Sequence, residues 1–272
     1  MAISFFNNYE INLSENSDLN WNYVKDINAL IAGKRGSGKS FLGLMMTKSI
    51  AGNFPYGQIF IVDFKRSDFY RLSALLPERR VASTKEEIFD LLEYYTKLMR
   101  QRIKFFETIP NSFGKTARDL KMPPFYLIYD EFGSFTSKLD TKEKKRHDSL
   151  IKDIVLLGRQ FNFGLIAIMQ QASVGNSGLD SLVKEQFGLV VHMGNATSSA
   201  LRQTFGEDIE HQKFRFKNGQ GQLRLDSLSY SNMTRPFTAK KLYPHLLWKD
   251  FETNFYDQND EKALFDHELK EQ

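Results

Sequence analysis

One eight-residue loop constrains the fold of this chain more than any other feature. Residues 33–40 read Gly-Lys-Arg-Gly-Ser-Gly-Lys-Ser and match the pattern G-x-x-x-x-G-K-[ST]. An apolar run precedes this loop at Ile27–Ala32, and a helical pattern follows it at Phe41–Ile50. A strand, a glycine-rich turn and a helix N-terminus in this order form a phosphate cradle, because glycines let successive backbone N–H groups converge on phosphate oxygens. The loop therefore predicts binding of a nucleoside triphosphate.

The whole loop is a candidate nucleotide-binding site. Lys39 is expected to reach the β- and γ-phosphates, and the Ser40 hydroxyl can hold Mg²⁺. An ordinary glycine-rich turn is the alternative, and the strand and helix on either side argue against it. The candidate nucleotide ligands are Gly33, Lys34, Arg35, Gly36, Ser37, Gly38, Lys39 and Ser40.

Composition excludes several other classes of protein. The chain has 272 residues with 41% hydrophobic content, which is enough to bury one large core. It contains no cysteine, which excludes a disulfide framework and a thiolate metal site, and its five histidines are widely spaced. The N-terminal residues lack the pattern of a secretory signal, and no apolar run approaches the ~20 residues of a membrane-spanning helix. We expect a soluble, cytoplasmic protein with no membrane span of its own.

Charge is distributed unevenly along the chain. The segment 251–272 holds seven acidic and two basic side chains. The whole chain has a net charge of +4, so the residues before this segment have a net charge of +9. A basic body permits a polyanionic partner such as nucleic acid, because neutralised phosphates release counterions. Lysines and arginines that only solvate helix surfaces are the alternative.

The lengths of the hydrophobic segments indicate the fold class. Strand-like and helix-like segments alternate, which predicts an α/β fold with a mostly parallel central sheet flanked by helices. One long helix is expected to begin at Ser83 or Thr84, with Glu86 or Glu87 completing a capping box. The other expected elements are strands at Gln58–Asp63, Phe125–Glu131, Leu165–Met169 and Phe187–His192, and helices from Thr141 onward and at Ser198–Phe205.

Periodicity also predicts which side chains face solvent. One face of the long helix is expected to be basic, and it is either a solvated face or a DNA contact. Its residues are Lys97, Arg100, Arg102 and Lys104. The helix from Thr141 is expected to bury Leu150, Ile151, Ile154, Val155 and Leu157. Residues 213–217 and 222–226 alternate in polarity around a glycine-containing turn, which predicts a hairpin with one apolar and one basic face. That basic face is either a charged sheet edge or a DNA contact.

Two strand ends supply the chemistry that the phosphate loop lacks. A buried strand ends in Asp130-Glu131. Asp130 can complete a Mg²⁺ site, and Glu131 can polarise a water for attack on the γ-phosphate. Gln170 follows another apolar run and should emerge at the same edge of the sheet, either to sense the γ-phosphate or as an exposed strand end.

The order of these motifs resembles the motor domain of FtsK/SpoIIIE DNA translocases, within the FtsK–HerA class of P-loop ATPases. The resemblance covers about residues 26–228. An arginine eleven residues before a strand-end glutamine is more specific than the nucleotide motifs alone. The segments that carry the resemblance are residues 33–40, Ile61–Lys65, Asp130-Glu131, Arg159–Gln170, Val183–Val191 and Ser198–Arg202.

The resemblance implies a RecA-like fold, with ATP and Mg²⁺ as cofactors. It also implies a homo-oligomeric ring, expected to be hexameric, with ATP between neighbouring subunits and DNA in the central channel. Asp130 matches the Mg²⁺ acid, Glu131 the catalytic base and Gln170 the sensor. Arg159 and Arg202 match arginines of the family pattern, and either is expected to reach a neighbour's γ-phosphate or to form a structural ion pair.

The sequence departs from the family pattern at three places. Asp63-Phe64-Lys65 stands where the family has Asp-Pro-Lys, which leaves the role of Lys65 open. Only 32 residues precede the loop, and the acidic end of the chain is too short for a winged-helix module. We therefore expect an N-terminal arm at 1–25, a motor domain at 26–250 and an acidic tail at 251–272.

The combined prediction is an ATP-hydrolysing translocase that moves double-stranded DNA. A mobile-element or phage setting is expected, with a membrane-anchored or relaxase partner. One alternative is a conjugative coupling or genome-packaging ATPase that acts on single-stranded DNA or nucleoprotein. Another is a nucleotide-switched interaction protein. A small-molecule kinase is disfavoured because no lid-like or acceptor-binding signature follows the loop.

Overall fold

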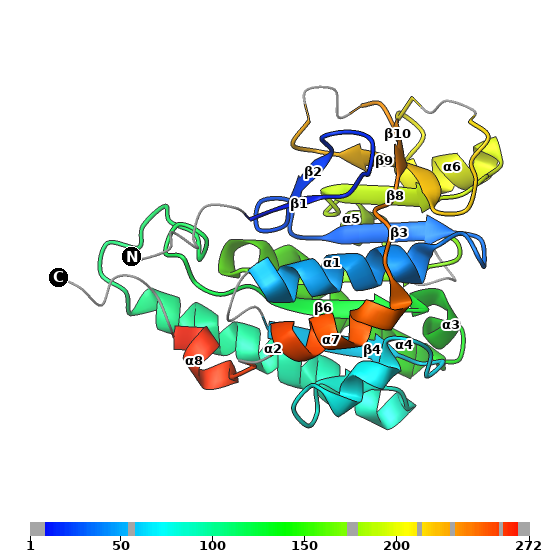
Figure 1. Ribbon diagram of the computed structural model, residues 1–272. Helices are drawn as coiled ribbons and strands as arrows, with labels where there is room; N and C mark the ends of the chain where they lie inside the picture. Colours follow the sequence, from blue (N-terminus) through cyan, green and yellow to red (C-terminus); the bar gives the residue numbers. More distant parts are fainter. Residues whose placement is uncertain are drawn as a thin grey trace.

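Helices flank both faces of an eight-stranded sheet in the computed structural model, which describes residues 9–53, 58–172, 179–210, 214–228, 232–255 and 258–265 (Figure 1). The strand order is β10-β9-β8-β3-β7-β6-β4-β5. Strand β9 runs antiparallel to both of its neighbours, and the other adjacent pairs are parallel. The mostly parallel α/β fold that the sequence predicts is confirmed. The strands are β3 (Ala29–Gly33), β4 (Gln58–Asp63), β5 (Val81–Ala82), β6 (Phe125–Asp130), β7 (Phe163–Met169), β8 (Leu189–Met193), β9 (Gln220–Leu225) and β10 (Arg235–Thr238).

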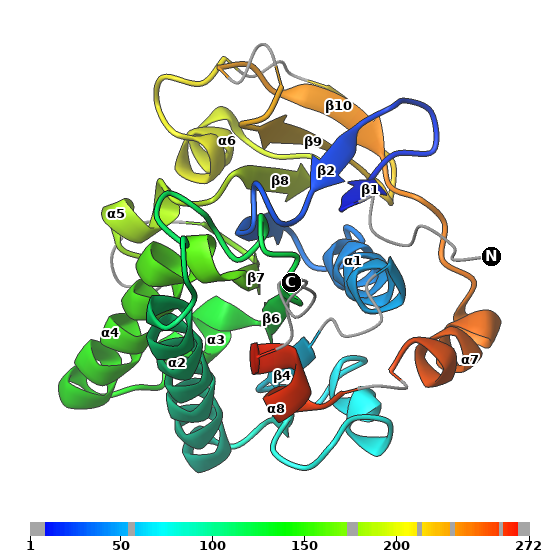
Figure 2. The same cartoon turned by 90° about the vertical axis from the view of Figure 1, so that its left-hand side faces the viewer.

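The helices form two layers, one on each face of the sheet (Figure 2). One layer contains α1 (Lys39–Asn53) and α7 (Pro244–Asn254). The other contains α2 (Lys85–Glu107), α4 (Thr141–Gly158), α5 (Ser181–Lys184) and α6 (Ser198–Phe205). The shorter helices are α3 (Phe132–Thr136), α8 (Asp260–Phe265), η1 (Tyr70–Ala74) and η2 (Arg159–Phe161).

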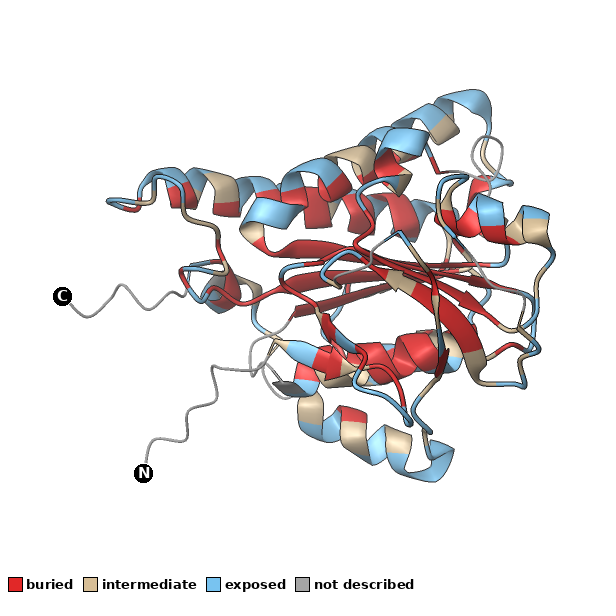
Figure 3. Ribbon diagram, turned by 90° about the horizontal axis from the view of Figure 1, so that it is seen from above, coloured by how far each residue is buried: buried red, intermediate tan, exposed pale blue. Residues whose placement is uncertain are grey.

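The central strands are buried along their whole length (Figure 3). In β6, Leu127 and Tyr129 pack into the core on the α2 side, whereas Tyr126 and Ile128 pack into the core on the α1 side. A strand covered on both faces needs apolar residues at successive positions, because its side chains alternate between the faces. This explains why these strands appear in the sequence as continuous apolar runs.

Local signals placed the helix starts correctly, but two side chains lie on the opposite face from the one predicted. Thr84 caps α2 and forms a capping box with Glu87. Arg102, predicted to be exposed, is fully buried because it lies four residues from both Leu98 and Phe106 on the apolar stripe. Leu157, predicted to be buried, is exposed, because α4 packs against the sheet through Gly158 instead.

The predicted hairpin between residues 213–217 and 222–226 is wrong. Strand β9 pairs with β8 and β10, and residues 214–217 form no strand. The Asn195 side chain satisfies both the N–H and the carbonyl of Phe216, at 2.7 and 2.8 Å. Leu223 and Leu225 of β9 are buried in the core on the α1 side. Their burial there favours pairing of β9 with β8. Lys213, in the predicted first strand, lies outside the described residues.

The described residues near both ends of the chain pack onto the central body. Strands β1 (Glu10–Asn12) and β2 (Asn20–Asn22) pair with each other, and Trp21 is buried in the core on the α1 side. Helix α8 buries Leu264 against the α2 side. The proposed boundaries at residues 25 and 250 stay a prediction. No helix within the described ranges is both long and apolar enough to cross a bilayer.

Candidate nucleotide site

The glycine-rich loop follows the carboxyl end of β3 and leads directly into α1. Gly33 is required by close packing, because a Cβ there would lie 2.4 Å from the carbonyl oxygen of Met193. Gly38 has a φ of +101°, in the region that favours glycine. Lys39 begins α1 and folds back so that its Nζ donates to the carbonyl of Lys34 at 3.0 Å. Burial lowers the pKa of Lys39, and the nearby carboxylates of Glu131 and Asp130 oppose that shift.

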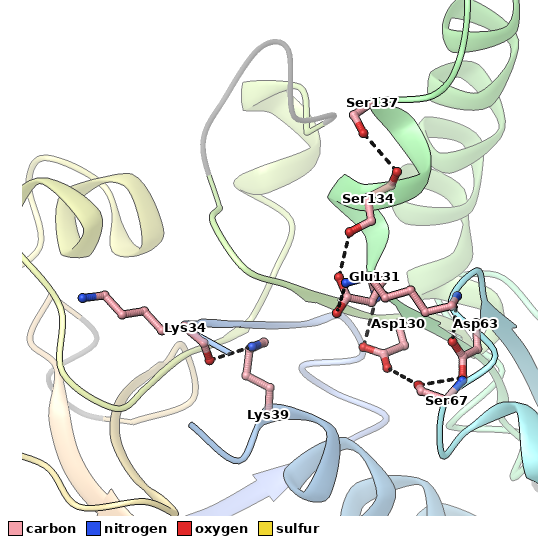
Figure 4. A network of polar contacts seen from close by, with 9 residues as sticks. Lys34, Lys39, Asp63, Ser67, Asp130, Glu131, Ser134 and Ser137 are labelled. Carbon is pink, nitrogen blue, oxygen red and sulfur yellow. Dashed lines mark hydrogen bonds and ion pairs between the residues drawn. The ribbon is translucent and has the colours of Figure 1, made fainter. Parts of the chain in front are cut away.

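Two buried carboxylates lie next to the loop at the ends of adjacent strands. Asp63 of β4 and Asp130 of β6 are register partners. The Ser67 hydroxyl joins them, because it donates to Asp63 Oδ2 at 2.9 Å and to Asp130 Oδ2 at 3.4 Å (Figure 4). Burial raises the pKa of Asp130 to about 7, with further contributions from Asp63 and Glu131.

The donor set around Asp130 fits a hard divalent cation. Among the described residues, no group of three or more His, Asp or Glu side chains is arranged to hold a metal. Mg²⁺ does not need such a group, because it commonly binds through one or two protein ligands and substrate phosphates. Asp130 and the Ser40 hydroxyl are therefore the residues that would hold Mg²⁺.

Glu131 is held in place by two neighbours (Figure 4). Its backbone is left-handed, with a φ of +56°, at the point where the chain turns from β6 into α3. Its Oε1 forms a 2.7 Å ion pair with Lys65 Nζ, and its Oε2 accepts from Ser134 Oγ at 2.8 Å. Burial alone raises the pKa of Glu131, but the hydrogen bonds from Lys65 and Ser134 outweigh it and leave the pKa below its usual range.

Gln170 emerges at the same edge of the sheet as the loop. It follows β7, whose residue Met169 is in register with Ala32 of β3. Gln170 lines a cavity of about 480 Å³ together with Arg35 and Ser134. The sequence prediction that loop, acids and glutamine converge is correct in geometry, and the sensing role of Gln170 stays a prediction.

The two family-pattern arginines have acidic neighbours within their own chain. Arg159 precedes β7, at the opposite edge of the sheet from the loop, and lines a small cavity of about 70 Å³ with Asp26 and Asp226. Burial raises the pKa of both carboxyls, and the charge of Arg159 partly opposes that rise. Arg202 on α6 lies with its Nε 3.7 Å from Oε2 of Glu207, and both side chains are exposed. The structure does not bring Arg159 to its own loop.

Three site residues were missed by the sequence reasoning or left without a role. Lys65 contacts the candidate base directly, although its motif departs from the family pattern. Ser67 links the two buried aspartates, and Ser134 donates to Glu131, the candidate base. The only sequence signal for Ser134 is its spacing of three residues from Glu131 at a helix start, and Ser67 has none.

Comparison with known proteins found one similar curated sequence and a set of solved structures with a similar fold. No family model matches the sequence. The chain is 26% identical over 223 residues to the FtsK domain-containing protein YdcQ of Bacillus subtilis (strain 168). That match covers 82% of this chain and 45% of the relative, so the chain spans less than half the length of the curated relative it matches.

Solved structures with the same fold include several ATPases. The pCW3 conjugation coupling protein TcpA, solved with ATPγS, matches 94% of this chain and 69% of its own, with a TM-score of 0.67 and 16% identity. EssC (ATPases 2 and 3) from Geobacillus thermodenitrificans matches 94% of this chain and 49% of its own, with a TM-score of 0.64 and 17% identity. The cytoplasmic domain of the type VII secretion ATPase EccC from Thermomonospora curvata matches 92% of this chain and 31% of its own, with a TM-score of 0.63 and 18% identity. The chain is thus similar in sequence to an FtsK domain-containing protein, and it shares its fold with the ATPases TcpA and EssC.

Proposed function

We propose that this chain is an ATP-hydrolysing DNA translocase of the FtsK/HerA class. The observation that carries the proposal is the convergence of Lys39, Asp130, Glu131 and Gln170 at one edge of the sheet. Phosphate binding, metal binding and a base are the three components that γ-phosphate hydrolysis requires. The chain combines them in one place.

In this proposal each residue has a distinct task. Lys39 and the loop N–H groups bind the phosphates, and Gln170 senses the γ-phosphate. Ser40 and Asp130 would hold Mg²⁺, and the bound ion would supply charge neutralisation at the phosphates. Glu131 orients the attacking water and accepts its proton.

The proposed substrate is double-stranded DNA, moved through a ring of six copies. Similarity to an FtsK domain and the basic body of the chain support a nucleic-acid substrate. The fold match to a conjugation coupling protein supports a mobile-element setting, with a membrane-anchored or relaxase partner. The same match favours, as the second candidate, a coupling ATPase that acts on single-stranded DNA or nucleoprotein.

The proposal is tested by the ATPase rate alone and with double- or single-stranded DNA. We expect double-stranded DNA to stimulate the wild type. Lys39→Ala should lose tight ATP binding, because it removes the cation at the β/γ-phosphates. Glu131→Gln should still bind ATP while turnover falls by about 10²-fold or more, because the base is gone.

Three outcomes would redirect the proposal. Stimulation by single-stranded DNA alone would favour the coupling ATPase. Nucleotide binding with no response to either DNA would favour a nucleotide-switched interaction protein. Full ATP affinity in a folded Lys39→Ala variant would remove the site itself.

A further inference from the structure

The candidate site opens into a cavity whose wall carries a cation that the motifs do not explain. The cavity has a volume of about 480 Å³. Arg35 of the phosphate loop lies on one wall, α3 contributes Ser134 to another, and Gln170 and Gln171 lie at the end of β7. The motif pattern G-x-x-x-x-G-K-[ST] places no requirement on position 35.

The residues around the cavity place it on the side of the loop where the terminal phosphate is processed. Ser134 donates to Glu131, the proposed base. Gln170 is the proposed γ-phosphate sensor. A base must lie within reach of the water that attacks the γ-phosphate, so a terminal phosphate near Glu131 also lies at the border of this cavity.

The charges around the cavity favour an anion. No carboxylate lines it. Arg35 is exposed, and no hydrogen bond or ion pair joins its side chain to another described residue. Lys34 also lines the cavity, as a second cation beside Arg35. Two other nearby cations are engaged, because Lys39 donates to the Lys34 carbonyl and Lys65 pairs with Glu131. A guanidinium presents several planar donors, which suits the oxygens of a phosphate.

Arg35 belongs to the loop and shares this cavity with Ser134, which contacts the proposed base. Arg159 and Arg202 instead have acidic neighbours within the chain. We infer that Arg35 is a further catalytic residue, which contacts the γ-phosphate from within its own subunit and stabilises the charge that develops there. The inference rests on the proposed ATPase function, and an arginine from a neighbouring copy would add to it.

The test compares binding of ADP and ATPγS, both with Mg²⁺, and ATP turnover. Arg35→Ala should keep its ADP affinity within about threefold and lose about tenfold or more of its preference for ATPγS, as expected when one charge-assisted phosphate contact is removed. Turnover should fall by about 10²-fold or more. Arg35→Lys keeps a cation and should recover part of the preference. The control is Arg118→Ala, which changes a partly exposed arginine on the loop between α2 and β6 and should behave as wild type.

Several results would overturn the inference. An unchanged preference for ATPγS with wild-type turnover in Arg35→Ala would show that this side chain does not contact the phosphate. An equal loss of ADP and ATPγS affinity would show that Arg35 only supports the loop. In both cases a wild type that binds and hydrolyses ATP leaves the proposed function standing. A wild type that binds neither nucleotide removes both proposals.

Discussion

At the scale of single residues, two contacts fix the orientation of the Glu131 side chain in the candidate site. Lys65 and Ser134 each bind one of its carboxylate oxygens. The left-handed backbone at Glu131 directs its side chain toward both partners as the chain leaves β6. Fixed orientation of a base is worth a large factor in rate, because small misplacements of a reacting group cost activity steeply. We therefore propose that Lys65 positions Glu131, the candidate base.

We predict that Lys65→Ala lowers the turnover number by about tenfold and changes the KM for ATP little, because the base loses one of its two supports. Lys65→Arg can still pair with the carboxylate and should retain most of the turnover. Steady-state kinetics of the three proteins measure both parameters. A rise in KM with unchanged turnover would mean that Lys65 contributes to nucleotide binding instead.

At the scale of elements, two buried arginines connect helices and strands that are distant in sequence. Arg102 on α2 donates to the carbonyls of Pro123, Phe161 and Ala263 at 2.7, 2.9 and 2.5 Å. Burial lowers its pKa to about 9, so it remains protonated at neutral pH. Arg80 forms a 2.5 Å ion pair with Asp260 at the start of α8. These contacts hold the described part of the C-terminal segment against the body.

We predict that Arg102→Met lowers the free energy of unfolding by about 3–5 kcal/mol, because three carbonyls, two of them in fully buried hydrogen bonds, lose a charged donor. Arg100→Met is the matched control on the same helix. Arg100 pairs with Asp153 at the exposed surface, and such pairs contribute about 1 kcal/mol or less. Urea denaturation of both variants measures the difference, and equal effects would refute a structural role for Arg102.

At the scale of the whole molecule, the sheet separates Arg159 from the phosphate loop. Arg159 precedes the amino end of β7, whereas the loop follows the carboxyl end of β3. One subunit cannot bring the two together without unfolding the strand. In a ring of copies, the amino edge of one subunit can face the loop of the next, so Arg159 is a candidate only between subunits.

We predict that mixing Arg159→Ala or Arg202→Ala with Glu131→Gln restores part of the ATPase activity that each variant lacks alone. A fraction of the mixed interfaces would then pair an intact base with an intact arginine. ATPase rates across mixing ratios measure this effect. Mixtures no more active than the sum of their components would place both arginines outside the active site.

The sequence by itself determined the glycine-rich loop between β3 and α1, the strand ends at Asp130 and Gln170, and the start of α2. All of these depend on short-range patterns: glycine spacing, continuous apolar runs and a capping box. They also sufficed to predict the parallel α/β fold. Chain order then placed the loop, the acids and the glutamine at one edge, because the carboxyl ends of parallel strands meet there.

Only the tertiary structure decided which distant groups meet. The pairing of Lys65 with Glu131, the burial of Arg102 among carbonyls of three other segments, and the choice of β8 as the partner of β9 all join residues that no local pattern relates. A side chain's surroundings depend on which elements pack against it, and buried polar groups take whatever partners that packing supplies. For this reason the prediction from charge periodicity that Arg102 is exposed was wrong. The alternating polarity of residues 213–217 predicted a strand, but residues 214–217 form none.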